Sequence, residues 1–318
     1  MQQRWPALVS AVVCVASVSL AAQAPSKALR TVDGQPDLQG VWNFSTITPL
    51  ERPAEFAGRE FLGDEEAKQL EQRTAVQSNR DNRGQSADAD VASAYNEFWW
   101  DRGVHVARVN GKARTSLIVD PPDGRIPALT AAGQARATAR ADARRQHGAD
   151  GPEDRSLGER CLLFNAGPPM LSGPYNNYVQ ILQTRDHVVI MNEMIHDTRI
   201  VPLDGRPHLP SSIRSWLGDS RGRWDGTTLV VETTNFTPKT NVRGSGEQLR
   251  LVERFTRSGA GTLLYEFTID DPESFTKPWT AALPMAKTTD QIFEYACHEG
   301  NYAMTGILRG ARSGEQAR

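Results

Sequence analysis

Cysteine is scarce in this 318-residue chain, which contains only Cys14, Cys161 and Cys297. None of them belongs to a Cys-x-x-Cys pair, the spacing that structural zinc sites commonly use. Charge of one sign is lacking as well, because 36 basic and 38 acidic residues leave a formal net charge of -2. We therefore expect no cofactor, no metal, no nucleic-acid partner and no stable membrane insertion.

The sequence is not expected to contain the catalytic motifs of the common enzyme classes. We expect no Gly-x-Ser-x-Gly elbow, and the sequence has no Gly-x-Gly-x-x-Gly loop, no P-loop and no His-Glu-x-x-His pair. These absences argue against standard serine hydrolases, dinucleotide-dependent enzymes, NTPases and zincin proteases.

Residues 1–24 are predicted to be a secretory signal peptide. Arg4 supplies positive charge, an apolar run extends from Ala7 to Leu20, and small residues follow. The run is too short for a membrane span of ~20 residues, and the alanines at its end suit cleavage. The mature protein is therefore expected to be exported, to the periplasm or the medium.

Removal of the signal peptide leaves Cys161 and Cys297, which we expect to form a disulfide bond. An exported chain enters an oxidising compartment, where a pair of cysteines is usually oxidised. The alternative is a metal-binding or nucleophilic thiol, because Cys297 is followed by His298 and Glu299.

The N-terminal part of the chain contains few regular patterns. Residues 25–111 are rich in turn formers and form a predicted irregular wrapping segment, with a short helix that starts at the candidate N-cap Asp64. Residues 112–310 form the predicted antiparallel β domain, interrupted near 130–147 by a helix that starts at Thr130. A disordered tail is expected at 311–318.

From Asn176 onward the sequence changes to short β-rich runs separated by turn residues. Arg185-Asp186, Asp225-Gly226 and the glycine-rich residues 258–261 read as hairpin turns. We interpret eight runs as strands of an antiparallel meander: "YVQILQT", "HVVIMNEM", "DTRIVPLD", "GRWDGTTLVVETTNF", "LRLVERFTR", "TLLYEFTID", "QIFEYACHE" and "YAMTGILRG".

The segment Gly40-Val41-Trp42 in "DLQGVWNF" resembles the Gly-x-Trp that opens the first strand of lipocalin-like (calycin) barrels. A long meander also needs a barrel or a sandwich to hide its edge strands. The expected fold class is therefore mainly β: an antiparallel meander closing into a calycin-like barrel, with an irregular N-terminal region and two or so short helices.

Nearly the whole mature chain also resembles a family of exported proteins of soil bacteria. The resemblance is carried by "ERCLLFNAGPPMLSGPYNNYVQI", by the stretch from "NEMIHDTRIVPLDGRPHLP" to "DGTTLVVETTNF", and by "EYACHEGNY". It implies export, and it implies no particular substrate or catalytic residue.

Alternation along the strands predicts which polar side chains face inward. Glu253 shares a face with Leu251 and Phe255, and Glu193 shares one with Arg199 if that strand is unbroken. With Asn235 and Tyr265 they are expected to line a mostly apolar cavity. The alternative is a buried Glu–Arg pair that only fixes strand register.

Several residues outside this set are candidates for ligand contacts. Trp99 and Trp100 are predicted to form a stacking platform or, alternatively, to plug a loop onto the core. Asn176 and Asn177 lie in a rigid proline-rich loop that borders the expected site. His196 is a further candidate, and a metal-binding role for it is disfavoured because Glu193-x-x-His196 falls in β-like sequence.

We therefore expect an exported β-barrel that binds a small apolar or amphipathic molecule in its interior. The alternative is a secreted hydrolase or lyase acting on a carbohydrate or a plant-derived small molecule. In that case Glu193 and Glu253 are the candidate acid and base, and Arg199 stabilises negative charge.

Overall fold

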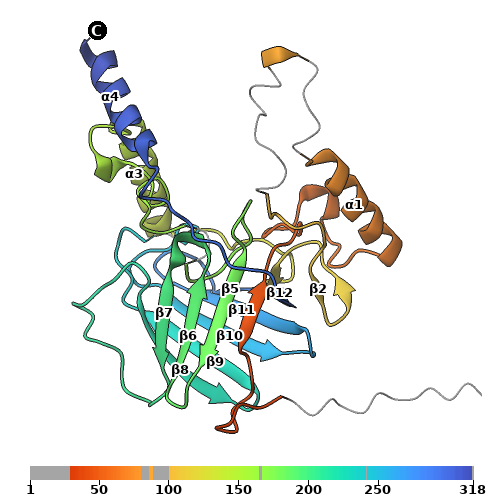
Figure 1. Ribbon diagram of the computed structural model, residues 1–318. Coiled ribbons are helices and arrows are strands. Elements are labelled where there is room, and N and C mark those ends of the chain that lie inside the picture. The colour runs from red at the N-terminus through yellow and green to blue at the C-terminus, as the bar shows by residue number, and fades with distance from the viewer. Residues whose placement is uncertain (1–28, 80–85, 89–99, 165–166, 241, 317–318) are drawn as a thin grey trace, which may run out of the picture.

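The computed structural model describes residues 29–79, 86–88, 100–164, 167–240 and 242–316 (Figure 1). The expected signal peptide at 1–24 and residue Trp99 lie outside these ranges. Within them the protein is mainly β, and antiparallel pairing joins ten strands into one sheet. No helix in the described ranges is long and apolar enough to cross a membrane.

The strands of the main sheet are β1 (Gly40–Asn43), β4 (Ile118–Asp120), β5 (Tyr178–Gln183), β6 (His187–Asn192), β7 (Thr198–Pro202), β8 (Asp219–Asp225), β9 (Thr228–Thr234), β10 (Arg250–Arg257), β11 (Thr262–Asp270) and β12 (Trp279–Thr288). A separate small hairpin consists of β2 (Arg108–Val109) and β3 (Lys112–Ala113). The α-helices are α1 (Asp64–Gln77), α3 (Ala131–Gln146) and α4 (Tyr302–Gln316).

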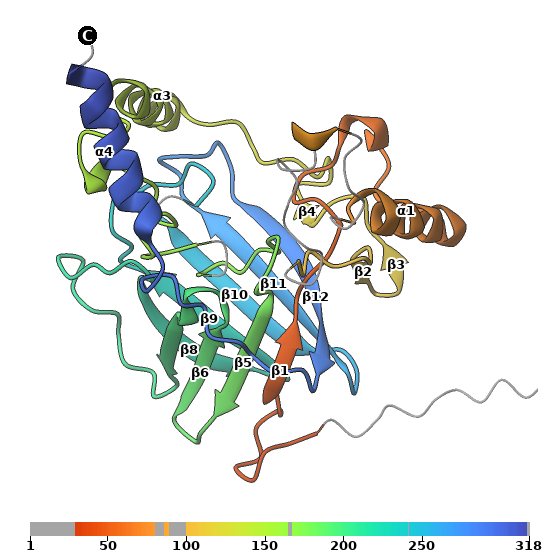
Figure 2. The same cartoon turned by 45° about the horizontal axis from the view of Figure 1, so that its top comes forward.

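The ladder runs in the order β7-β6-β5-β1-β12-β11-β10-β9-β8, and β4 is added beside β12. Figures 1 and 2 show that the sheet curls over on itself, so that β5, β6 and β7 face β9, β10 and β11 across the core. The predicted hairpins are confirmed between β5 and β6, between β8 and β9, and between β10 and β11.

The two ends of the ladder, β7 and β8, approach each other without pairing. A Cβ atom at Gly222 of β8 would lie 2.9 Å from Val201 Cγ1 and 2.7 Å from Leu203 Cδ2, at the end of β7. In the described part of the chain no ladder hydrogen bonds join these strands. The described sheet is therefore curled and antiparallel, and it is not hydrogen-bonded into a closed barrel.

Alternation of side chains on β10 and β11 builds the core as predicted. Leu251, Glu253 and Phe255 of β10 are buried, and so are Tyr265 and its alternate neighbours on β11. Trp42 of β1 is fully buried and donates its indole N–H to the carbonyl oxygen of Leu38 (2.9 Å). Bulky side chains thus fill the space enclosed by the curled sheet.

Two predicted strands near the C-terminus are wrong. The run "QIFEYACHE" has no regular structure, and "YAMTGILRG" starts helix α4, which continues to Gln316 through most of the predicted disordered tail. Met304, Ile307, Leu308 and Ala311 recur at helical spacing and are partly buried, whereas their neighbours are exposed. A nine-residue window did not distinguish this helical period from strand alternation.

One long strand was missed. Strand β12 lies at the centre of the ladder, where Pro284 faces Leu264 of β11. A proline normally argues against a central strand because it cannot donate a ladder hydrogen bond. The sequence "WTAALPMAKT" is not among the eight predicted strands, and its proline is a local signal against β-structure.

Helix α3 begins as predicted, whereas α1 does not use its predicted cap. The hydroxyl of Thr130 accepts a hydrogen bond from the Gly133 amide (3.0 Å), which is a normal N-cap. In α1 the N-cap is Gly63, and Asp64 is the first helical residue. An acidic residue still suits this position because the N-terminus of a helix carries partial positive charge.

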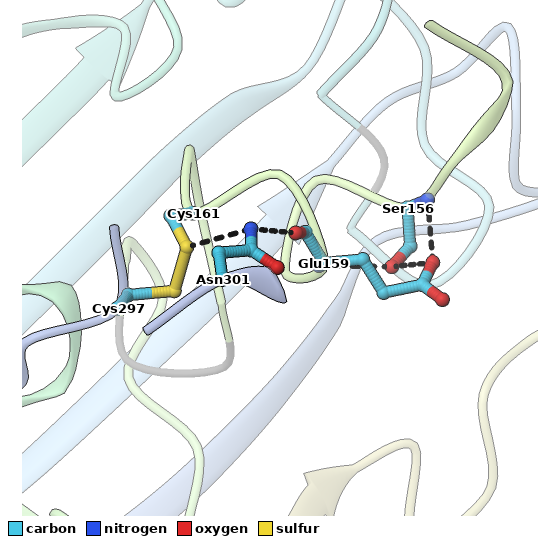
Figure 3. The surroundings of a disulfide bond; sticks show 5 residues. All are labelled: Ser156, Glu159, Cys161, Cys297 and Asn301. Atoms are coloured by element: carbon cyan, nitrogen blue, oxygen red, sulfur yellow. Dashed lines mark hydrogen bonds between the residues drawn. A yellow bond between two sulfur atoms is a disulfide. The ribbon is translucent and has the colours of Figure 1, made fainter. Parts of the chain in front are cut away.

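The predicted disulfide between Cys161 and Cys297 is present, with a Cα–Cα distance of 5.8 Å (Figure 3). Beside it, the Asn301 amide donates to the Glu159 carbonyl oxygen (2.8 Å), and the Glu159 carboxylate accepts from the Ser156 amide (2.9 Å). The bond and this network attach the segment before α4 to the loop that follows α3.

We predict that reduction of this disulfide lowers the melting temperature. The cysteines are separated by 136 positions, and closing so long a loop removes unfolded-chain entropy worth at most roughly 5 kcal/mol. Thermal melts of the mature protein with and without reductant, alongside a Cys161→Ser/Cys297→Ser variant, measure the effect. Free thiols detected by mass spectrometry in the oxidised protein would contradict the pairing.

Candidate functional site

A buried polar cluster crosses the interior of the curled sheet. Arg199 of β7 donates two hydrogen bonds to Glu253 of β10, from Nη1 to Oε2 (2.5 Å) and from Nη2 to Oε1 (2.9 Å). The Tyr265 hydroxyl donates to Glu253 Oε1 (2.8 Å) and accepts from the Met170 amide (3.1 Å). The Arg199 side chain is 3% exposed and that of Glu253 is 0% exposed.

Arg199 and Glu253 thus form a buried ion pair, and this pair fixes the position of β7 relative to β10. Both Glu253 oxygens already accept hydrogen bonds, and burial together with the Glu253 charge holds the pKa of Tyr265 well above its usual value of 10. A carboxylate held in this way by a neutral phenol and a guanidinium is poorly placed to exchange protons with a substrate. Its partners instead join β7, β10, β11 and the loop at Met170.

The strand that was expected to carry both Glu193 and Arg199 is broken between them. Strand β6 ends at Asn192, a 3-10 turn covers Met194–His196, and β7 begins at Thr198. Ile195 and His196 have left-handed φ values of 58° and 47°. Such values are unfavourable for a β-branched residue, and they are found mainly where the surrounding structure forces them.

The broken strand separates two side chains that were predicted to face the same cavity. Glu193 Oε1 accepts a hydrogen bond from the Phe293 amide (2.9 Å), outside the Arg199–Glu253 cluster. The prediction of one shared face is therefore wrong, because it assumed an unbroken period of two.

Buried polar atoms without hydrogen bonds concentrate at this turn. Within the described residues, Asn192 Nδ2 and Oδ1, Glu193 Oε2 and Asp197 Oδ2 have no partner of normal geometry. Each such atom costs about 1–3 kcal/mol relative to a hydrogen-bonded one. Four such atoms lie within six residues. This turn therefore holds polar groups that are left without hydrogen-bond partners inside the protein.

Burial also shifts the acidity of the carboxyl groups in this region. It raises the pKa of Asp197 to about 6, although His196 and Arg199 favour the charged form. Burial raises the pKa of Glu193 too, and the negative charge of Asp101 raises it further. Asp101 itself has a raised pKa because burial outweighs the hydrogen bonds it receives, including one from the Asn177 amide (3.4 Å).

Aromatic side chains come from the same segments as Asp101 and the Phe293 amide that contacts Glu193. The ring of Tyr175 stacks on Tyr295 with centroids 6.2 Å apart, and Trp100 meets Tyr175 edge-on, also at 6.2 Å. Burial and the neighbouring Tyr295 raise the pKa of Tyr175 to about 12. A pocket of about 310 Å³ is lined by Trp100 of this row, by Asn43, Ser45 and Asp101, and by residues 75, 78 and 102–105, whereas Tyr175 and Tyr295 are not among its lining residues.

These features gather at one end of the sheet, which we call the polar end. In the ladder Asn43 of β1 faces Tyr178 of β5, and Val179 faces Asn192 of β6, so the ends of three strands coincide. The polar end consists of Asn43, Trp100, Asp101, Tyr175, Asn192, Glu193 and Tyr295.

The other predicted contact residues have different roles. Asn177 is fully buried and holds its loop together, accepting from the Gly173 amide (2.7 Å) and donating to the Gly173 carbonyl oxygen (3.0 Å). Asn176 has a left-handed φ of 55° and lies beside Glu193, where it favours the charged form of that carboxyl. His196 is exposed.

Asn235 does not line the cavity for which it was proposed. It follows the last residue of β9, has a φ of 57°, and donates to the carbonyl oxygens of Leu209 (2.9 Å) and Pro210 (3.3 Å). Strand β9 ends at Thr234, so the alternation of side chains along the strand does not extend to Asn235. Asn235 instead fixes the loop that leads into β8.

Sequence reasoning overlooked one motif and several site residues. The spacing Gly-x-Ser-x-Gly does occur, at Gly218–Gly222, but it lies at the start of β8 and not on a strand-to-helix elbow. The Ser220 hydroxyl is hydrogen-bonded to that of Thr233 (2.9 Å), so a base-activated nucleophile is not present there. Asp101, Tyr175, Asn192, Asp197 and Tyr295 were not proposed, although Asp101 directly follows the tryptophan pair.

Comparison with protein-family models and with curated proteins found no match.

The substitution Glu253→Gln is predicted to destabilise the protein by about 3–5 kcal/mol, because it leaves the Arg199 charge buried without a counter-charge. The matched control is Glu232→Gln, which removes a partly exposed ion pair with Arg250 on the neighbouring strand and should cost about 1 kcal/mol or less. Urea unfolding monitored by circular dichroism measures both. Equal losses for the two variants would show that the interior pair has no special role.

Stability should also depend on the ionisation of Asp197. Its pKa in the folded protein, about 6, lies above its usual value of 3.8, so the folded state binds more protons than the unfolded state between these values. The Asp197 contribution is therefore most favourable below about pH 4 and is lost as pH rises through 6. Melting temperatures measured across this range should show Asp197→Asn gaining stability relative to the unmodified protein as pH rises. A constant difference between the two proteins would contradict the raised pKa.

Proposed function

We propose that this is an exported protein that binds a small amphipathic molecule at the polar end of its sheet. The observation that carries the proposal is the group of buried, unsatisfied polar atoms at Asn192 and Glu193, close to the stacked rings of Tyr175 and Tyr295. A folded protein retains such groups at a net cost, and a ligand that supplies their hydrogen bonds recovers that cost.

The chemistry of the polar end indicates which molecules suit it. Carboxyl and amide side chains bind hydroxyl groups, and tyrosine and tryptophan rings bind the apolar face of a sugar or an aromatic ring. A phenolic glycoside carries both kinds of group. The pocket of about 310 Å³ beside Trp100 and Asp101 is of the size that such sites have.

We also propose that the curled sheet is a calycin-like barrel and that the protein is exported. Approach of β7 and β8 supports a barrel-like arrangement related to the calycin type, with the interior filled by side chains. The Cys161–Cys297 disulfide supports an oxidising destination, which agrees with removal of residues 1–24 as a signal peptide.

Catalysis by acid–base chemistry is a second candidate function. It is favoured by the raised pKa values of Glu193 and Asp101, since a general acid requires a carboxyl group whose pKa lies above its ordinary value. In this case the bound glycoside is hydrolysed, with Glu193 as the candidate acid. Glu253 is not carried into this mechanism, because its oxygens are held by Arg199 and Tyr265.

Chromogenic 4-nitrophenyl glycosides test both functions in one experiment. Binding is followed by saturation-transfer NMR, and hydrolysis by release of 4-nitrophenolate. We predict that Tyr295→Ala weakens binding about tenfold or more, whereas Tyr302→Ala, which removes an 82% exposed tyrosine from α4, has no effect. Glu193→Gln should abolish any hydrolysis and leave binding largely intact.

The proposed location is wrong if no aryl glycoside binds, or if the two tyrosine variants bind equally well. Binding without release of 4-nitrophenolate would assign the protein to the binding class alone.

A further inference from the structure

Two arginines of helix α3 face the body of the protein without a counter-charge. Arg136 and Arg140 lie one helical turn apart, and both side chains are half-buried. Within the described residues all their hydrogen bonds go to main-chain carbonyl oxygens or to a hydroxyl, and none goes to a carboxylate. The function proposed for the polar end does not account for this pair.

The segment that follows α3 shows how such a group is usually compensated. Arg155 contacts Glu159 at 2.5 Å and Arg160 contacts Glu153 at 2.6 Å, and these two arginine side chains are 24% and 14% exposed. A cation that is moved out of water needs a partner, because burial disfavours the charged form. The pair on α3 lacks such a partner.

The two guanidinium groups of the pair also repel each other. Side chains four positions apart are neighbours on a helix, and like charges there are destabilising. In agreement with this, burial lowers the pKa of Arg140 and the positive charge of Arg136 lowers it further. An anion bound between the two groups would supply the missing partner and offset the repulsion.

Arg136 is fixed in place, and one edge of its guanidinium stays open. Its Nη2 donates to Ser274 Oγ (2.6 Å) and to the Glu273 carbonyl oxygen (3.2 Å). A Cβ atom at Gly246 would lie 3.4 Å from its Cζ and Nε, so the group packs on the backbone there, and Nε is buried. Its Nη1 makes no hydrogen bond in the described residues and is open to solvent.

The acidic residue of this network, Asp271, does not pair with Arg136. It is buried, and its carboxylate accepts from the Ser274 amide (3.1 Å), the Ser274 hydroxyl (2.6 Å) and the Gly246 amide (2.7 Å). It reaches Arg136 only through the Ser274 hydroxyl. Asp271 therefore positions Ser274 and Gly246, and its oxygens are already occupied.

Arg140 is held more loosely than Arg136. Its two Nη atoms lie 3.4–3.5 Å from the carbonyl oxygens of Pro238 and Ser245, which is long for a hydrogen bond. Its Nε makes no hydrogen bond in the described residues and is open to solvent. The pair therefore offers accessible N–H donors on two neighbouring guanidinium groups.

The number of uncompensated charges indicates the ligand. A phosphate group carries close to two negative charges near neutral pH and presents three acceptor oxygens. Guanidinium groups bind phosphate through paired N–H···O contacts. We propose that a phosphate group, either the free ion or a monoester, binds between the open edges of Arg136 and Arg140. This site shares no residue with the polar end and does not depend on the function proposed there.

The test uses inorganic phosphate and glycerol phosphate as probes, with sodium acetate at the same ionic strength as a singly charged comparison. Assigned amide and arginine Nε–H signals of the full mature protein are followed by NMR in phosphate-free buffer. We expect millimolar amounts of either phosphate to shift signals of residues 136, 140, 245 and 246, and acetate to leave them unchanged. Tighter binding of inorganic phosphate would assign the free ion, and tighter binding of glycerol phosphate would assign a monoester.

A matched pair of variants on the same helix locates the site. Arg140→Gln removes one member of the pair, whereas Arg144→Gln removes the same charge from an exposed position one turn further along α3. Phosphate affinity should fall about tenfold or more in the first variant and change less than about twofold in the second. In phosphate-free buffer Arg140→Gln should melt at or above the temperature of the unmodified protein, because the repulsion is gone. Added phosphate should raise the melting temperature of the unmodified protein and not that of Arg140→Gln.

Melting curves first establish that each variant is folded. The proposal is overturned if neither phosphate shifts these signals, if acetate shifts them as strongly, or if Arg140→Gln and Arg144→Gln bind phosphate alike. Loss of phosphate binding in Tyr295→Ala would also overturn it, since that result places the anion at the polar end.

Discussion

The pair between Arg199 and Glu253 holds the curled sheet together across its interior. Strand β7 is the end of the ladder, so its only strand partner is β6. The guanidinium of Arg199 reaches through the core to β10, and Tyr265 extends the contact to β11 and to the amide of Met170. Without that contact the free edge of β7 would have only side-chain packing to keep it near β8.

The cost of this arrangement explains its rigidity. Desolvating a guanidinium and a carboxylate is offset only when their geometry is good and their remaining atoms are satisfied. Glu253 meets that condition through its two contacts with Arg199 and one with the Tyr265 hydroxyl, whereas Arg199 Nε has no hydrogen bond among the described residues. The position of β7 is therefore well defined, and so is the turn that leads into it.

Much of the sheet was predictable from the sequence, because alternation along β10 and β11 is regular over eight or more residues. Secondary structure was predicted wrongly where the local sequence pattern favours one conformation and packing in the folded protein imposes another. "NEMIHD" contains no glycine or proline, so nothing in it indicates the left-handed turn at Ile195 and His196. Pro284 is a local signal against the central strand β12. The nine residues "YAMTGILRG" are too few to distinguish the helical period of α4 from strand alternation.

The candidate site was predictable only in part for the same reason. Glu193, Trp100 and Asn176 were selected by type and position, and the structure brings them to one end of the sheet. Asp101 and Tyr175 adjoin Trp100 and Asn176 in the sequence and were not selected, whereas Tyr295 comes from a distant segment that no local pattern connects to them. The chain order of a meander does not reveal which loops meet at its end.

The turn at residues 192–197 links the stability of the sheet to the function proposed for its polar end. The unsatisfied polar atoms of Asn192, Glu193 and Asp197 each cost about 1–3 kcal/mol relative to hydrogen-bonded ones. The turn withstands that cost because β6 fixes one side and the Arg199–Glu253 pair fixes the other. A strained loop held from both sides keeps its polar groups in place before a ligand arrives. Binding at the proposed site would then require little ordering, so more of the interaction energy would appear as affinity.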